Sequence, residues 1–131
     1  MKRFLNYFII ALLIAISGLL LHNLMQEKTV AEEIDYNLAK INELSINQIT
    51  SSNPYDYIDN DHYNNIIKLG MPAVSVLEEK YSNNELHGLN AYIAALAIQE
   101  ITGIQISEEA DETWETAEEF FAQWNKIKHM Q

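Results

Sequence analysis

The feature that most constrains this chain is an uninterrupted apolar run near its N-terminus. No residue from Phe4 to Leu21 is charged, and only two of them are polar. A helix of this length measures about 27 Å, close to the roughly 30 Å hydrocarbon core of a bilayer. Two basic residues, Lys2 and Arg3, precede the run, and positive charge is retained on the cytoplasmic side. We therefore expect residues 1–28 to be a targeting segment, with the rest of the chain outside.

Two fates are open to this segment, a retained signal anchor or a cleaved signal peptide. The apolar region of a signal peptide usually has about 7–15 residues, fewer than this run. Small residues at Thr29 and Ala31 give a tolerable cleavage pattern before Glu32, but this pattern lies ten residues beyond the run. We favour a single-pass anchor in the cell membrane. The alternative is a protein secreted after cleavage.

The charge balance excludes several classes of partner. The chain has 131 residues, of which 19 are acidic and 8 basic, for a formal net charge of -11. Such an acidic protein repels the phosphates of nucleic acids and anionic lipid headgroups, so we expect no nucleic-acid binding. The acidic residues are expected mainly to form a soluble surface, the alternative being a site for a basic partner. The absence of cysteine excludes disulfides and thiolate chemistry.

Residues 29–53 are predicted to form an amphipathic linker helix. "TVAE" at residues 29–32 matches a capping box, which marks a helix start. An apolar stripe then recurs at helical spacing from Val30 to Leu44. The stripe is too short to define a coiled coil, so we expect it to fold back on the domain or act as a spacer. The alternative is a weak homo-oligomer through Val30–Leu44.

Residues 54–131 are predicted to be a helical domain. Asp61 is expected to cap a short helix that Gly70 ends, and Pro72 suits the first turn of the next helix. The segment 85–103 is apolar around most of its circumference, which is typical of a helix buried among others. A second capping box begins the last helix at Thr116. Because no segment alternates as strands do, the predicted fold class is all-α.

The run "IIKLGMPAVSVLEEKYSNNELHGLNAYIAALAIQEITGI" resembles a HEAT-like repeat unit. The resemblance extends over residues 54–128 and is closest to small, single-domain, membrane-anchored bacterial proteins. It implies that the alanine-rich second helix lies in the inner layer. Only one repeat is present, whereas solenoids need about three to bury a continuous core. The resemblance therefore implies a compact bundle in which the flanking helices act as caps.

No pattern in the sequence indicates catalysis, a cofactor or a metal site. The four histidines are scattered, and there is no nucleophile elbow or phosphate loop. The carboxylates at Asp56–Asp61 lack the glycine and the final glutamate of a calcium loop. We therefore expect a protein without enzymatic activity. The less favoured alternative is a carboxylate-dependent hydrolase that uses Asp56–Asp61 or Glu108–Glu119.

Tyrosines at the start of the domain are the candidate binding residues. "NPYDY" is followed closely by a further tyrosine, and tyrosine is common both at interfaces and in cores. The sequence predicts Tyr55, Tyr57 and Tyr63 as possible partner-binding residues, and "NPYDY" is the best candidate for an exposed aromatic patch. The expected function is that of an anchored, extracytoplasmic module that binds another protein. A self-associating structural protein is the alternative.

Overall fold

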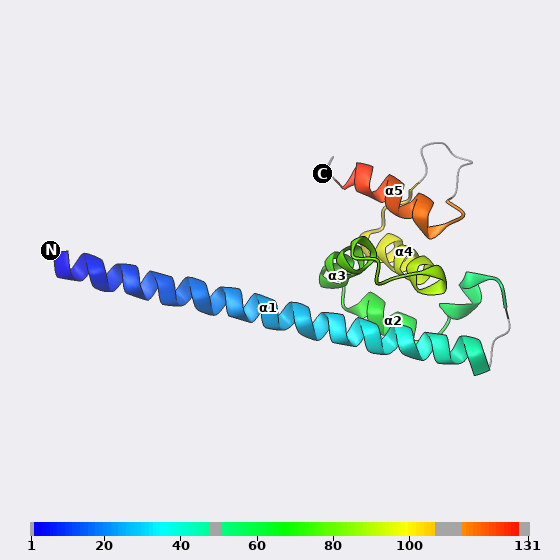
Figure 1. Cartoon of the computed structure of the whole chain (residues 1–131), viewed down its shortest axis with the longest axis horizontal. Helices are drawn as coiled ribbons and strands as arrows, with labels where there is room; N and C mark the ends of the chain where they lie inside the picture. Colours follow the sequence, from blue (N-terminus) through cyan, green and yellow to red (C-terminus); the bar gives the residue numbers. More distant parts are fainter. Residues whose placement is uncertain (1, 48–50, 107–113, 129–131) are drawn as a thin grey trace.

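The computed structural model describes residues 2–47, 51–106 and 114–128, with side chains from residue 5 onward. Figure 1 shows one long helix with the other helices gathered beside its second half. No residue in the described ranges belongs to a strand, which confirms the predicted all-α class. The elements in order are α1 (Lys2–Asn47), the 3₁₀ turn η1 (Pro54–Tyr57), α2 (Asp61–Lys68), α3 (Met71–Ser82), α4 (Gly88–Thr102) and α5 (Ala117–Ile127).

The helix α1 runs without a break through its 46 residues, a length of about 69 Å. The capping box predicted at Thr29 is therefore wrong as a helix start. The Thr29 hydroxyl donates instead to the carbonyl of Met25, 2.9 Å away and one turn earlier. The helix already exists upstream, so the backbone N–H groups near Thr29 have partners within it and need no cap.

The two halves of α1 have different surroundings. Every side chain from Leu5 to Thr29 is exposed. This half is long and apolar enough to cross a membrane, and a signal sequence meets the same criteria. In the second half, Ile34, Leu38 and Ile41 are buried against α2 and α3. The stripe thus folds onto the domain, and two chains joined through Val30–Leu44 would have to displace these helices.

The short helix α2 begins one residue earlier than predicted. Asn60, and not Asp61, is its cap, because the Asn60 side chain accepts a hydrogen bond of 3.0 Å from the Tyr63 backbone N–H. The chain then turns at Gly70, whose φ of +65° favours glycine. Pro72 occupies the first turn of α3, as predicted.

The helix α4 lies at the centre of the domain and contacts α2, α3, α5 and η1. Ile93, Ile98 and the alanines between them are fully buried, which confirms the prediction of a central, enclosed helix. Small alanine side chains let the neighbouring helices approach closely. The helix ends at Gly103, whose φ is +67°.

The helix α5 covers α4 on the side away from α1 (Figure 1). Its predicted capping box is confirmed: the Thr116 hydroxyl accepts from the Glu119 N–H at 3.2 Å, and the Glu119 carboxylate accepts from the Thr116 N–H at 3.3 Å. Phe121 of α5 stacks on Tyr81 of α3 with ring centroids 3.7 Å apart. Aromatic packing therefore joins the last helix to the rest of the core.

Candidate functional site

The three tyrosines predicted as possible binding residues lie in different environments. Tyr57 and Tyr63 are buried, and only Tyr55 is exposed, with 54% of its surface accessible. The Tyr57 hydroxyl donates to the Ser51 carbonyl at 2.6 Å, and the Tyr63 hydroxyl donates to the Glu100 carboxylate at 2.9 Å. A tyrosine ring can be buried once its hydroxyl has such an acceptor. This corrects the expectation of a shared aromatic patch.

Tyr63 is held firmly in its neutral form. Burial, and then the hydrogen bond to the carboxylate of Glu100, raise the pKa of Tyr63 far above its ordinary value. A phenol in this setting cannot serve as a base near neutral pH. Its role in the described structure is to tie α2 to α4.

A partly buried polar cluster joins α1 to α2. The Asn37 amide N–H donates to the Glu33 carbonyl at 2.8 Å, so the amide oxygen of Asn37 points the other way. That oxygen lies 3.1 Å from His62 Nδ1 and accepts from the Asn65 amide at 3.4 Å. His62 therefore donates from Nδ1. These groups satisfy one another, which makes the cluster a structural link.

An ion-pair cluster holds α3 against α1. Lys80 Nζ lies 2.8 Å from Asp35 and 3.2 Å from Glu85, and only 13% of the lysine side chain is accessible. Burial lowers the pKa of Lys80, but the hydrogen bonds to the two carboxylates outweigh it and the pKa is raised. Lys80 thus stays charged and paired at neutral pH.

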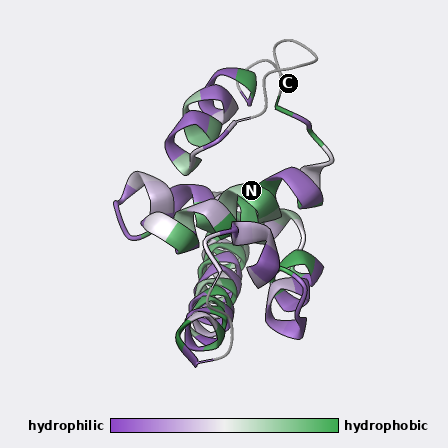
Figure 2. Ribbon diagram, turned by 90° about the vertical axis from the view of Figure 1, so that its right-hand side faces the viewer, coloured by the Kyte–Doolittle hydropathy of each residue, from purple (hydrophilic) through white to green (hydrophobic). Residues whose placement is uncertain are grey.

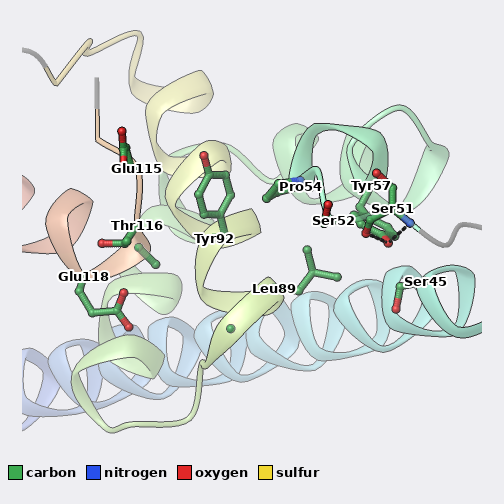
Figure 3. Close-up of a pocket in the computed structure, with 12 residues that line it drawn as sticks. Ser45, Ser51, Ser52, Pro54, Tyr57, Leu89, Tyr92, Glu115, Thr116 and Glu118 are labelled. Atoms are coloured by element: carbon green, nitrogen blue, oxygen red, sulfur yellow. Dashed lines mark hydrogen bonds between the residues drawn. The ribbon is translucent and has the colours of Figure 1, made fainter. Parts of the chain in front are cut away.

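One open site is a cleft of about 460 Å³ at the end of the domain farthest from the apolar half of α1. We call it the distal cleft. Figure 3 shows its residues coming from the end of α1, the η1 turn, and the N-termini of α4 and α5. Its apolar wall consists of Pro54, Leu89 and Tyr92, and its polar residues include Ser45, Ser51, Ser52, Glu115, Thr116 and Glu118.

Aromatic packing holds the wall of the distal cleft. Tyr92 lies between Tyr55 and Trp114, with ring centroids 6.3 and 4.7 Å away. The indole N–H of Trp114 donates to the Gln99 side chain at 2.9 Å. Burial, and then a hydrogen bond with the Tyr55 hydroxyl, raise the pKa of Tyr92. Tyr55 therefore contacts Tyr92 of the wall, which links the predicted binding segment to the cleft.

The carboxylates that line the distal cleft, Glu115 and Glu118, have different surroundings from the carboxylate of Glu119 in the capping box. Glu119 uses its side chain to accept from the backbone N–H groups of Glu115, at 2.8 Å, and Thr116. Glu115 and Glu118 are exposed and line the cleft. None of the described residues that line it is basic. The cleft therefore combines an apolar wall with two carboxylates that no described residue of its lining pairs as a cation.

A second hollow, of about 440 Å³, lies between the start of α3 and the ends of α4 and α5. Its carboxylate, Glu78, accepts from the Trp124 indole N–H and lies 3.5 Å from Lys128 Nζ. Its charge is thus paired within the chain, unlike that of the distal cleft. No group of three or more histidine, aspartate or glutamate side chains in the described ranges is placed to hold a metal ion.

No protein-family model, curated protein or solved structure matches this chain. The resemblance to HEAT-like repeats stays a prediction. Two features that the sequence analysis had singled out, the η1 segment and the capping box at Thr116, line opposite sides of the distal cleft. Ser45 and Leu89 carried no such signal, since only the folded chain brings them together.

Proposed function

We propose that this protein is a membrane-anchored, extracytoplasmic helical module that binds another protein at the distal cleft and has no catalytic activity. The observation that carries the proposal is the position of the cleft on α1. Ser45 at its edge lies 24 residues after Leu21, which is about 36 Å along the helix. An anchored chain would therefore present this cleft away from the bilayer.

The fold supports a fixed position of the distal cleft relative to the anchor. The anchor and the domain share one unbroken helix, and the domain packs along its second half. Figure 2, coloured by hydropathy, shows hydrophobic and hydrophilic residues together on the domain helices around the end of α1. A bound partner would be held at a set height above the membrane.

The lining of the cleft indicates the chemistry of the partner. Leu89 and Tyr92 offer apolar contact, while Glu115 and Glu118 attract positive charge. A peptide segment with an apolar side chain next to lysine or arginine fits this combination. Both carboxylates are exposed, whereas the general acid of a glycosidase is held in an apolar pocket. Binding is therefore favoured over hydrolysis.

A site-specific cross-linking experiment in intact membranes tests this proposal. A photo-reactive residue replaces Ser52, which is exposed in the distal cleft, and Asn125, exposed on α5 outside the cleft, is the matched control. We expect a discrete adduct from position 52 only. The double variant Glu115→Lys and Glu118→Lys should abolish it, and Glu79→Lys, an exposed charge reversal on α3, should not. Equal adducts from both positions would remove the proposal.

A further inference from the structure

The helix α3 crosses α1 where its apolar half ends. One hollow between them is lined by Asn23 and Val30 of α1 and by Pro72 and Ser75 of α3. A neighbouring hollow is lined by α1 residues 24–31 and by α3 residues from Val76 to Lys80. Both ends of α3 thus lie beside the same short stretch of α1. The helix therefore runs across α1 and not along it.

The register of α1 gives the height of α3 above a bilayer. If the hydrocarbon core ends at Leu21, Asn23 lies about 3 Å beyond it and Val30 about 14 Å. The middle of this stretch is about 8 Å beyond the core, and a helix with its side chains has a radius of about 5 Å. The near side of α3 is then about 3 Å from the hydrocarbon. This places it within the headgroup layer, which is about 5–7 Å thick on each side.

The exposed residues at this level suit a lipid surface. Leu24, Met25 and Met71 are 62%, 71% and 59% accessible, although all three are apolar. Nearby lysines are paired with carboxylates: Lys28 with Glu32 at 3.9 Å, and Lys80 with Asp35. Glu27 and Glu79, exposed acids that line these hollows, also lie at this level, so the contact suits zwitterionic and not anionic headgroups.

We propose that α3 is a second membrane contact, lying in the headgroup layer with Met71 and Pro72 against lipid. The contact rests on the anchor of the proposed function but not on the distal cleft. Methionine and proline need no hydrogen bond from their side chains, so they can replace water at the interface without loss. The domain would then sit on the bilayer and not hang freely from the anchor.

Position-specific quenching tests this contact. The chain has no cysteine, so a single introduced cysteine carries a fluorophore at one known place. Ser75→Cys places it on α3, and Ser52→Cys, also an exposed serine, places it at the distal cleft as the matched control. The full chain is reconstituted in phosphatidylcholine vesicles in which some lipids carry a headgroup spin label. We expect loss of fluorescence for Ser75→Cys and none for Ser52→Cys.

A third label separates failure of the contact from failure of the anchor. Ala15→Cys lies in the apolar half of α1 and is read with lipids spin-labelled on the acyl chain. Quenching of Ala15→Cys without quenching of Ser75→Cys overturns the α3 contact and leaves the anchor in place. Absence of quenching at both positions overturns the anchor together with the contact. Equal headgroup quenching of Ser75→Cys and Ser52→Cys also overturns the contact, because it means that the domain lies down on the bilayer.

Discussion

The two halves of α1 share one backbone and differ only in their side chains. From Leu5 to Met25 every side chain is exposed and most are apolar. From Val30 to Leu44 a single stripe is apolar, and its central residues are buried by α2 and α3. The backbone hydrogen bonds of a helix lie within the helix, so α1 can pass from one setting to the other without a break.

The difference shows that the distribution of apolar residues around a helix decides which of its sides must be covered. A helix that is apolar all round has no side to give to water, so it needs lipid or a protein on every side. A helix with one apolar stripe needs cover on that side alone, and α2 and α3 provide it. The following predictions test whether the two halves behave as independently as this comparison implies.

The largest expected effect comes from the buried stripe. Leu38→Ala should lower the free energy of unfolding of the domain by about 2–5 kcal/mol, because it leaves a cavity in the core. Denaturant unfolding of the full chain in detergent, followed by the fluorescence of Trp114 and Trp124, measures this. Leu19→Ala is the control, since Leu19 is exposed in the first half. Equal destabilisation by both variants would contradict the division of α1.

A charge introduced into the apolar first half of α1 should weaken membrane insertion and leave the stability of the domain unchanged. Ile14→Arg should oppose membrane insertion by about 2.5–3.5 kcal/mol, the cost of a charge at the centre of a spanning helix. Extraction of membranes at alkaline pH should release more of this variant than of the wild type. Ile46→Arg is the control, because Ile46 is 78% accessible near the other end of α1. Both variants should unfold at the wild-type denaturant concentration.

A smaller loss is expected from the polar link between α1 and α2. Asn37→Ala leaves His62 and Asn65 without their shared acceptor, which should cost about 1–3 kcal/mol of unfolding free energy. The same unfolding assay measures it, with Asn64→Ala as an exposed control on α2. If both asparagine variants are as stable as the wild type, the cluster does not hold α2 to α1.

Alkaline pH should weaken the domain through Tyr63. Its folded-state pKa is raised above the unfolded value of about 10, so its stabilising contribution is complete below pH 10 and is lost as pH rises. The slope reaches at most about 1.4 kcal/mol per pH unit. Tyr63→Phe should flatten the decline in unfolding free energy between about pH 10 and 11.5. A decline of unchanged slope in this variant would assign the effect to other groups.

The smallest expected effect concerns the ion pair that holds α3 to α1. Asp35→Asn should cost less than about 1 kcal/mol, because Asp35 is 59% accessible and water screens the pair. It should also lower the pKa of Lys80, which now depends on its two carboxylate partners. NMR titration of the lysine side chain tests this, and Glu32→Gln is the control at an exposed pair. An unchanged lysine titration would contradict the pairing.

Short-range signals were the reliable part of the sequence. The capping box at Thr116 and the proline in the first turn of α3 each act within a few residues, and both predictions are confirmed. The capping box at Thr29 failed because a helix arriving from upstream had already satisfied those N–H groups. A capping-box motif therefore marks a helix start only where no helix already runs into it from the preceding residues.

The sequence by itself determined the helical class, the apolar half of α1 and the enclosed position of α4, because these follow from the spacing and type of neighbouring residues. Only the tertiary structure decided what covers each face. Tyr55, Tyr57 and Tyr63 look alike in the sequence, but two are buried because Ser51 and Glu100 accept their hydroxyl hydrogens. The distal cleft depends on the packing of four distant segments, and such packing depends on contacts across the whole core.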